Sequence, residues 1–420
     1  MDGRLGDLLS LGDLAEASPA DAAHHLRVAR QRIAYGVALA DLAGVFELER
    51  VVTLLSDFAD KALDIAIRIA IAERYPGAGC EGFAALGLGK HGSRELNYSS
   101  DIDPILLFDP ELMPHREREE PVEAAARIAR RVVELLQNRD GDGYVFRVDL
   151  RLRPSPEATP PALPIDAAIG YYESSALPWE RAAFIRARAC AGDIVLGQRF
   201  LGAIRPFVWR RALDYGALHE IRSISRRIRD HHAQGQIFGP GYDLKRGRGG
   251  IREVEFFAQI HQLIHGGREP SLRAPATLDA LAALAGGGRI SADDAEMLAT
   301  AYRLYRTIEH RLQMVNDQQT HSLPRDAEAL DNVAALHGVA DGAALIALLA
   351  PHVEAVGRCY DSLENGDAEQ VSTDAEGLEQ QLARAGFADP AAARQRIEDW
   401  REAKARTLRT SAAREALEAM

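Results

Sequence analysis

The apolar residues of the N-terminal region recur at helical spacing. Leu26, Ile33 and Val37 share one face of a predicted helix, and Glu47–Arg74 has further apolar periodicity with polar breaks. An apolar stripe of this kind predicts helices that bury one face. The Tyr75–Gly77 sequence, which contains a proline and a glycine, then predicts the end of this helical region.

After Gly82 the pattern changes from helical to strand-like. Phe83–Leu88 is a short apolar run that predicts a buried strand, and Ile102–Phe108 predicts a second strand. A helical pattern follows at Val122–Asn138. This order of elements predicts a domain that contains both a sheet and helices.

A third predicted strand covers Tyr144–Pro154, where apolar and polar residues alternate from Phe146 onward. Alternation places successive side chains on opposite faces of a sheet. The predicted core face consists of Phe146, Val148, Leu150 and Leu152. The predicted polar face consists of Arg147, Asp149, Arg151 and Arg153.

The remaining chain has mainly helical patterns. Glu180–Cys190 predicts a helix, Ser291–Gln318 predicts a long helix, and the acidic stretch Asn365–Thr373 predicts a linker. We therefore predict an α+β, mostly helical fold in four segments. These are an N-terminal helical segment at 1–77, a sheet-containing domain at 78–212, a helical bundle at 213–365, and a linker with the first helices of a further region at 366–420.

Charge and composition exclude several classes of protein. The chain has 420 residues and a formal net charge of -12, so we expect no nucleic-acid partner, because phosphate binding needs a basic surface. Its three cysteines are far apart in the sequence, which predicts neither a zinc site nor a disulfide. We find no signal-peptide pattern and no uncharged apolar stretch long enough to cross a membrane. We therefore expect a cytoplasmic protein with no membrane partner.

Two aspartates mark the start of the second predicted strand. Asp101 and Asp103 are two residues apart, so their carboxylates point the same way from the strand. Adjacent carboxylates repel each other, which raises the pKa of at least one of them unless a cation lies between them. Mg²⁺ suits such a pair, because it takes oxygen ligands and keeps coordination positions open for a phosphate. A pair of this spacing on its own is more often a solvated turn.

A Gly92-Ser93 step precedes the two aspartates. A glycine lets backbone N–H groups approach a phosphate, and a helix that began there would add a favourable dipole. Taken alone, a glycine-serine step is usually a turn. The combination of a strand, this step and a strand that begins with two aspartates is more specific, and it resembles the polymerase-beta-like nucleotidyltransferases. In that fold a neighbouring strand supplies a third carboxylate, and Asp149 fits this role. The alternative role of Asp149 is a salt bridge to the adjacent arginines.

The full string GLGKHGSRELNYSSDID at Gly87–Asp103 resembles a narrower family, the bifunctional glutamine synthetase adenylyltransferase/adenylyl-removing enzymes of bacterial nitrogen regulation. The resemblance covers about residues 20–365. Further segments that resemble this family, in order, are VFRVDLRLRPS at Val145–Ser155, Tyr171-Tyr172, Trp179-Glu180-Arg181, YDLKRGRGGIREVEF at Tyr242–Phe256, HGGREPSLR at His265–Arg273 and VNDQQTHSLP at Val315–Pro324. The family usually has an apolar residue where Pro104 stands, so we expect an unpaired or edge position there.

The resemblance also indicates which half of the enzyme the chain represents. The family has two related catalytic halves; the N-terminal half removes AMP by phosphorolysis, and the C-terminal half attaches AMP from ATP. Leu96–Asp103 and Gly249–Phe256 resemble the N-terminal half. We therefore expect one catalytic half, a fragment of a longer protein, and the domain at 78–212 as its nucleotidyltransferase domain.

The resemblance implies the substrates and partners of the site. The predicted reaction takes adenylylated glutamine synthetase and inorganic phosphate and yields ADP, with Mg²⁺ held by Asp101, Asp103 and Asp149. A PII signalling protein is a further expected partner. Because phosphate is an anion, a cationic pocket is required beside the transferred AMP. The phosphate- or nucleotide-binding candidates are Lys90, Gly92, Ser93, Arg151, Arg153, Lys245, Arg246 and Arg252. A solvated or salt-bridged surface position remains the alternative for each cation.

Two other functions remain open from the sequence. One is an adenylyltransferase that consumes ATP, as in the other half of the family. The other is a non-catalytic helical module that binds glutamine synthetase or a PII protein. The three acidic residues favour a catalytic role over the second alternative, because a non-catalytic copy does not need three converging carboxylates.

Overall fold

The computed structural model describes residues 18–210, 237–365, 374–384 and 389–402. The chain divides into two compact units, Met1–Gly357 and Arg358–Met420. The predicted α+β fold is confirmed, since helices predominate and the strands form a four-stranded mixed sheet. The predicted segments 1–77, 78–212 and most of 213–365 belong to the first compact unit, and their internal boundaries stay predictions.

The N-terminal region folds as two long helices, α2 at Pro19–Leu42 and α3 at Leu48–Ala72. The Ser18 side chain accepts a hydrogen bond from the Asp21 N–H and caps α2, which satisfies one of the free donors at the helix start. α3 carries the wide apolar face that its sequence predicts, and it packs against α5 at Pro121–Gln137. Both predicted helical regions are confirmed.

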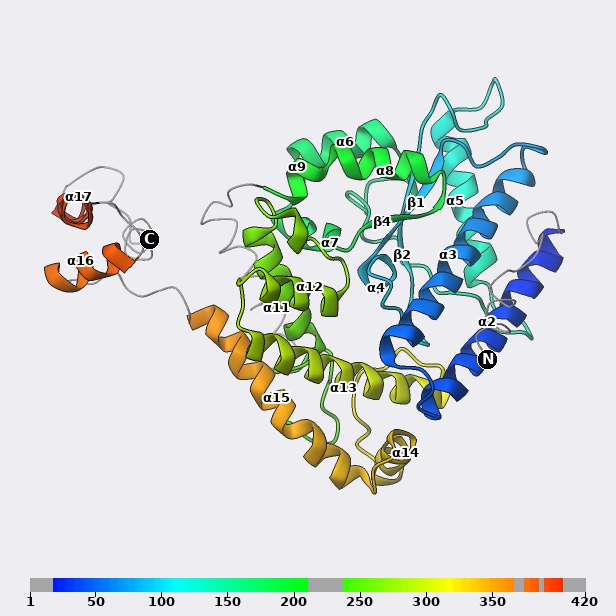
Figure 1. The fold of residues 1–420 in the computed structure, drawn as a ribbon. Coiled ribbons are helices and arrows are strands. Elements are labelled where there is room, and N and C mark those ends of the chain that lie inside the picture. Colours follow the sequence, from blue (N-terminus) through cyan, green and yellow to red (C-terminus); the bar gives the residue numbers. More distant parts are fainter. Residues whose placement is uncertain (1–17, 211–236, 366–373, 385–388, 403–420) are drawn as a thin grey trace. The chain divides into compact units, whose positions relative to one another are not determined.

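The sheet has the order β3-β2-β1-β4. Its strands are β1 at Phe83–Leu88, β2 at Asp103–Phe108, β3 at Ala162–Pro164 and β4 at Arg188–Gly192. β1 pairs antiparallel with β2 and β4, whereas β2 and β3 are parallel. β1 and β2 are the two central strands (Figure 1). Their register sets Leu88, the end of β1, opposite Asp103, the first residue of β2.

The two faces of the sheet contribute to different apolar clusters. Phe83 and Ala85 of β1 pack with residues of α2, α3 and α5. Ala84 and Leu86 pack with residues of four later helices, α6 at Ile165–Ser174, α7 at Pro178–Phe184, α8 at Ile194–Ala203 and α9 at Arg205–Val208. Alternation along the strand produces this division. The sheet is therefore covered by helices on both faces.

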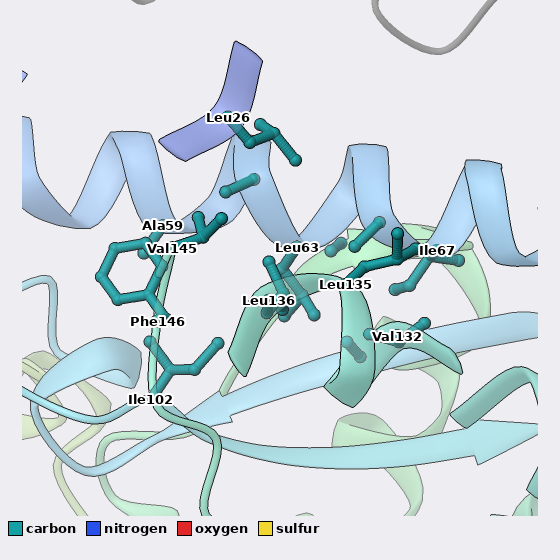
Figure 2. Close-up of a cluster of buried hydrophobic side chains, with 14 of the residues drawn as sticks. Leu26, Ala59, Leu63, Ile67, Ile102, Val132, Leu135, Leu136, Val145 and Phe146 are labelled. Carbon is teal, nitrogen blue, oxygen red and sulfur yellow. The ribbon is translucent and has the colours of Figure 1, made fainter. Parts of the chain in front are cut away.

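Figure 2 shows part of the first cluster. Leu63 and Ile67 of α3 face Leu136 and Val132 of α5, and Phe146 lies beside them from the chain that follows α5. All five side chains are buried. Burial of an aliphatic side chain of this size contributes about 1.5–3 kcal/mol, so this cluster fixes the segment after α5 against the sheet domain.

Two predicted elements are corrected by the structure. The predicted strand at Tyr144–Pro154 is wrong, because it forms only one isolated bridge, between Val148 and Ile102. The chain turns soon after this bridge, at residues 151 and 152, and Arg153 donates to Leu150 O across the turn, so the pairing does not continue. The predicted helix at Glu180–Cys190 is half wrong, since α7 covers Pro178–Phe184 and the rest becomes β4.

The remaining helices complete the two units. They are α4 at Gly89–Gly92, α6 at Ile165–Ser174, α8 at Ile194–Ala203, α9 at Arg205–Val208, α11 at Ile251–His265, a 3-10 turn at Pro270–Leu272, α12 at Thr277–Gly286, α13 at Ala292–Asn316, α14 at Ala327–His337, α15 at Gly342–Asn365, α16 at Ala375–Arg384 and α17 at Pro390–Glu402. The long helix predicted at Ser291–Gln318 is confirmed. Most of the predicted linker, and residues 403–420, lie outside the described residues.

One helix in the described part of the chain, Gly342–Leu363, is long and apolar enough by composition to cross a membrane, although no such stretch was expected. A single helix of this kind is weak evidence, because buried core helices pass the same test. Leu345, Leu349 and Val356 of this helix are fully buried. These residues lie on one buried face, and 33% of the apolar window is buried inside the protein.

Pro104 lies where the sheet tolerates a residue without an N–H. It stands opposite Gly87 of β1, but β2 pairs with β3 only from Leu106 to Phe108. On the β3 side, β2 is therefore an edge at Pro104, as expected from the sequence.

α13 carries a row of buried polar side chains. His310 is fully buried, with Nε2 3.0 Å from Asn97 Oδ1 and Nδ1 3.8 Å from Asp41 Oδ2. Arg306 donates to the same Asn97 oxygen, and Arg311 binds Asp41 at 2.7 Å. Burial lowers the pKa of His310 to about 4, and the neighbouring Arg306 adds to this effect. His310 is therefore neutral in the folded protein near neutral pH.

Lowering the pH from 7 to 5 is expected to destabilise the protein through His310. The unfolded histidine, with a pKa near 6.5, takes up a proton in this range, whereas the folded one does so only near 4. The contribution of His310 to the free energy of unfolding therefore falls by about 2 kcal/mol. Urea unfolding of the parent protein and of His310→Gln at pH 7 and 5 measures this loss as the difference between their pH dependences. His310→Gln should remove it, and the exposed control His25→Gln should keep it; an unchanged pH dependence in His310→Gln would refute the assignment.

Candidate active site

Three carboxylates meet beside the start of β2. Asp101 precedes the strand, Asp103 begins it, and Asp149 comes from the segment after α5. One oxygen from each lies within 4.8 Å of the others. The Ile102 N–H donates to Arg147 O at 3.0 Å and the Asp149 N–H donates to Ile102 O at 2.9 Å. This short backbone pairing, rather than a regular strand, carries Asp149 to the other two acids.

The surroundings shift the pKa values of Asp103 and Asp149 in opposite directions. Burial, together with the charges of Asp101 and Asp149, raises the pKa of Asp103 to about 7, although Lys245 and Arg151 oppose the rise. The Arg151 guanidinium lies 2.9 Å from both Asp149 oxygens, and this hydrogen bonding lowers the pKa of Asp149. The charged form of Asp103 is therefore disfavoured by burial and by the two neighbouring carboxylates, and a bound cation would favour it.

Gly89 leaves the space beside Asp103 open. It has a φ of 54°, and a Cβ added there would lie 2.7 Å from Asp103 Oδ2. A larger residue would meet the carboxylate and would also be strained in this backbone conformation. The sequence pattern predicts a role for Gly92 and Ser93 but not for Gly89, although the position of this glycine directly after β1 is a signal that could have indicated it.

Gly92 and Ser93 are buried in the turn after β1. A Cβ on Gly92 would lie 2.1 Å from Arg186 O, so this glycine is required for close packing of two backbone segments. The Ser93 N–H and hydroxyl both donate to Gly89 O at 3.2 Å. Their role in phosphate contact stays a prediction, and their observed contacts shape the turn that holds Gly89.

Lys90 points away from solvent into a buried ion pair. Its Nζ lies 2.8 and 3.1 Å from the two oxygens of Glu309 on α13. Glu309 has no exposed surface, and His321 Nδ1 lies 2.7 Å from one of the same oxygens. Burial lowers the pKa of Lys90 to about 8 despite the Glu309 charge. Lys90 thus ties the turn after β1 to α13, and its predicted contact with phosphate stays a prediction.

The two arginines near Asp149 have different surroundings. Arg153 donates to the backbone oxygens of Leu150, Pro156 and Pro160 and thereby holds its own loop in place. Arg151 has an exposed side chain that forms an ion pair with Asp149. Arg151 is therefore the member of this pair that is positioned to meet a ligand above the acids.

A cationic segment joins the acids from the chain before α11. The Asp243 carboxylate accepts the N–H groups of Lys245 and Arg246, which shapes the turn. Lys245 lies close enough to lower the pKa of Asp103. Among the described residues, the side chains of Lys245 and Arg246 form no hydrogen bond or ion pair. Arg252 stacks on Phe256, with its guanidinium carbon 5.7 Å from the ring centre. These cations retain donors for an anionic ligand.

Gln319 makes a contact with the site that the sequence does not predict. Its side-chain nitrogen donates to Asp101 Oδ1 at 2.6 Å from the loop after α13. It belongs to Val315–Pro324, a segment that carries the family resemblance but no predicted site residue. More than two hundred residues separate the two partners in sequence, so neither spacing nor periodicity could have predicted the contact.

A second group of metal-ligating residue types lies apart from the acids. Asp60, His91 and Cys190 offer atoms within 4.8 Å of one another. The Arg188 guanidinium already binds both Asp60 oxygens, at 2.7 and 2.6 Å, and His91 Nε2 lies 2.8 Å from the same carboxylate. The charge of the Asp60 carboxylate is therefore already balanced by Arg188, and both of its oxygens already have hydrogen-bond partners.

The fold and the site together are of the nucleotidyltransferase type. The fold is α+β, two carboxylates lie at the start of a central strand, and a third comes from the segment after α5. Residues 10–203 match the family model described as Glutamate-ammonia ligase adenylyltransferase, and residues 221–363 match the model described as GlnD PII-uridylyltransferase. Relatives named bifunctional glutamine synthetase adenylyltransferase/adenylyl-removing enzyme include one from Caulobacter vibrioides, 43% identical over 90% of this chain and 40% of its own length. One from Rhizobium meliloti is 41% identical over 97% of this chain and 44% of its own length.

The chain belongs to the family of the bifunctional glutamine synthetase adenylyltransferase/adenylyl-removing enzymes. It spans about two fifths of the length of the curated relatives that it matches. The resemblance noted in the sequence is therefore confirmed at the level of the family.

Proposed function

We propose that this chain removes AMP from the adenylylated tyrosine of glutamine synthetase by phosphorolysis, releasing ADP. The observation that carries the proposal is the meeting of Asp101, Asp103 and Asp149 beside a cationic segment that keeps free donors. Acids and cations on adjoining segments suit a reaction in which two phosphate groups come together.

The acids fit Mg²⁺ by their chemistry. All three donors are carboxylate oxygens, Gly89 leaves the space beside Asp103 unobstructed, and the raised pKa of Asp103 reflects its burial next to two other carboxylates. Mg²⁺ prefers such oxygen donors. When bound to Asp101, Asp103 and Asp149, it would polarise the phosphorus of AMP and offset charge on the attacking and leaving oxygens.

The cations supply the counter-charge that the nucleophile needs. Inorganic phosphate and the adenylyl phosphate are both anions, so they repel each other unless cations lie between them. In the proposal Lys245 and Arg246 bind the incoming phosphate, Arg252 extends this pocket, and Arg151 contacts the transferred group above Asp149. Lys90 and Arg153 support the surrounding turn and loop.

The bond changes balance with phosphate as the only co-substrate. An oxygen of inorganic phosphate attacks the phosphorus of the adenylyl group, the bond from that phosphorus to the tyrosine oxygen breaks, and ADP forms. The tyrosine leaves as a phenolate and takes a proton from solvent. A tyrosine has a pKa of about 10, so it leaves more readily than an alcohol.

The direction of the reaction rests on the resemblance of Leu96–Asp103 and Gly249–Phe256 to the deadenylylating half of the family. The test uses glutamine synthetase carrying labelled AMP. The proposal predicts labelled ADP only when inorganic phosphate is added. Incorporation of AMP from ATP into unmodified glutamine synthetase would instead support an adenylyltransferase, and the absence of both reactions would support a binding module.

Lys245→Ala is expected to weaken phosphate use more than turnover. Removing an ammonium that forms no ion pair within the described part of the chain should raise the KM for inorganic phosphate about tenfold, because one charge-assisted contact is worth about 1.5 kcal/mol. Steady-state phosphorolysis at varied phosphate measures the change. Lys61→Ala, on the exposed side of α3, is the matched control and should leave KM unaltered. An unchanged KM in Lys245→Ala would remove this residue from the phosphate pocket.

The proposed function also implies a cellular location and a regulatory partner. We place the reaction in the cytoplasm and expect a PII signalling protein as a regulatory partner of the longer enzyme. The match of residues 221–363 to a model described by PII uridylylation supports that expectation. Neither nucleic acid nor a membrane surface is a proposed partner, in keeping with the net charge of -12.

A further inference from the structure

The loop that follows α13 is held at both of its ends. At its start, Asp317 has a φ of 48° and turns the chain out of the helix. The Arg30 guanidinium lies 3.1 Å from the Asp317 carboxylate, and the Ser99 hydroxyl donates to Asp317 O at 2.9 Å. The beginning of the loop is therefore anchored to α2 and to the residues just before Asp101.

The end of the loop is anchored to α13 and to the cationic segment. His321 Nδ1 lies 2.7 Å from Oε1 of the buried Glu309 carboxylate, which also binds Lys90. The Leu244 N–H donates to His321 O at 2.8 Å, directly before Lys245. Anchors on both sides leave little freedom for the residues between them.

Gln319 lies between these anchors and reaches the acids. Its amide nitrogen donates to Asp101 Oδ1 at 2.6 Å. A carboxylate with one oxygen fixed by a donor has a defined orientation, and its second oxygen keeps its lone pairs for another ligand. The donor also offsets part of the repulsion between Asp101 and the other two acids.

We propose that Gln319 is a positioning residue, which orients the Asp101 carboxylate so that the three acids form one cation site. The proposal rests on the function proposed above, since it concerns the same acids. Gln319 acts through Asp101 and does not itself contact the reacting groups. The anchors at Asp317 and His321 set its position, so α13 and the cationic segment both determine the geometry of the acids.

The test compares two neighbouring glutamines of the full chain. Gln319→Leu removes the donor at similar size. Gln318→Leu is the matched control, since it makes the same change one residue earlier, at an exposed side chain that forms no hydrogen bond to another described residue. Mn²⁺ binding, followed by the electron paramagnetic resonance signal of the free ion, reports on the acids without requiring turnover.

Gln319→Leu is expected to weaken Mn²⁺ binding about tenfold, as loss of an outer partner of a metal ligand commonly does. Gln318→Leu should bind Mn²⁺ within about twofold of the parent protein, and both variants should melt within a few degrees of it. Equal affinity in Gln319→Leu and the parent would overturn the positioning role, as would equal weakening in both variants.

Asp103→Asn separates this inference from the proposed function. If the parent protein does not bind Mn²⁺, or if Asp103→Asn binds it as tightly as the parent does, the proposed metal site fails and the positioning role fails with it. If that binding exists and Gln319→Leu leaves it intact, only the positioning role fails.

Discussion

Asp103→Asn is expected to reduce phosphorolysis by about 10³-fold or more while the protein stays folded. Loss of a group that stabilises charge at the reacting centre commonly has an effect of this size. The change removes the central member of the acid group but keeps the size of the side chain. Release of labelled ADP from adenylylated glutamine synthetase measures the loss.

The same substitution has an opposite expected effect on stability. Burial raises the pKa of Asp103 to about 7, so the folded protein holds a proton that the unfolded chain releases near its usual value of about 3.9. Stability contributed by this proton is present at low pH and is lost as the pH rises through 7. In chelator at pH 8, Asp103→Asn should therefore stabilise the protein, by about 2 kcal/mol after allowance for partial solvent exposure.

Thermal melts with chelator and with Mg²⁺ test both expectations for Asp103. Mg²⁺ should raise the melting temperature of the parent protein and leave that of Asp103→Asn unchanged. Asp166→Asn, at an exposed position in the first turn of α6, is the control and should keep full activity. Normal phosphorolysis by Asp103→Asn would show that the acids are not the active site.

Glu309→Gln is expected to destabilise the folded protein strongly. Glu309 is fully buried and faces Lys90, Arg306 and His321. Burial opposes the charge of this carboxylate, but these three partners outweigh it and hold its pKa well below the usual range. Removing the charge leaves Lys90 and Arg306 without this buried counter-ion, which typically costs about 3–5 kcal/mol.

Denaturant unfolding at pH 7.5 measures the effect of Glu309→Gln. The control is Glu49→Gln, which breaks an ion pair with Arg303 on the exposed side of α13, the helix that also carries Glu309. Exposed pairs contribute about 0–1 kcal/mol, so this variant should unfold almost as the parent does. Equal effects of the two substitutions would contradict the view that the buried pair joins α13 to the turn after β1.

The sequence predicted the parts of the site that depend on local spacing. Asp101 and Asp103 precede and begin a strand as expected, since short-range alternation determines where their carboxylates point. Asp149 lies with them, although its predicted strand is absent. Its backbone bond to Ile102 places it there, so the predicted position is correct and the predicted regular pairing is wrong.

The parts that were not predicted depend on distant contacts. β4 contains Arg188, Ala189 and Ala191, a composition that favours a helix, but pairing with β1 overrides this local preference. Glu309 binds Lys90 from α13, and Gln319 binds Asp101 from the loop after this helix. Such contacts follow from how the helices pack on the sheet, and no pattern within one segment encodes them.

The fate of labelled inorganic phosphate tests the central claim most directly. The chain would be incubated with adenylylated glutamine synthetase, Mg²⁺ and ³²P-labelled phosphate, without ATP. Phosphorolysis predicts that the label appears in the β-phosphoryl group of ADP, in an amount equal to the tyrosine groups freed. Release of unlabelled AMP, or no release without ATP, would contradict the proposed reaction.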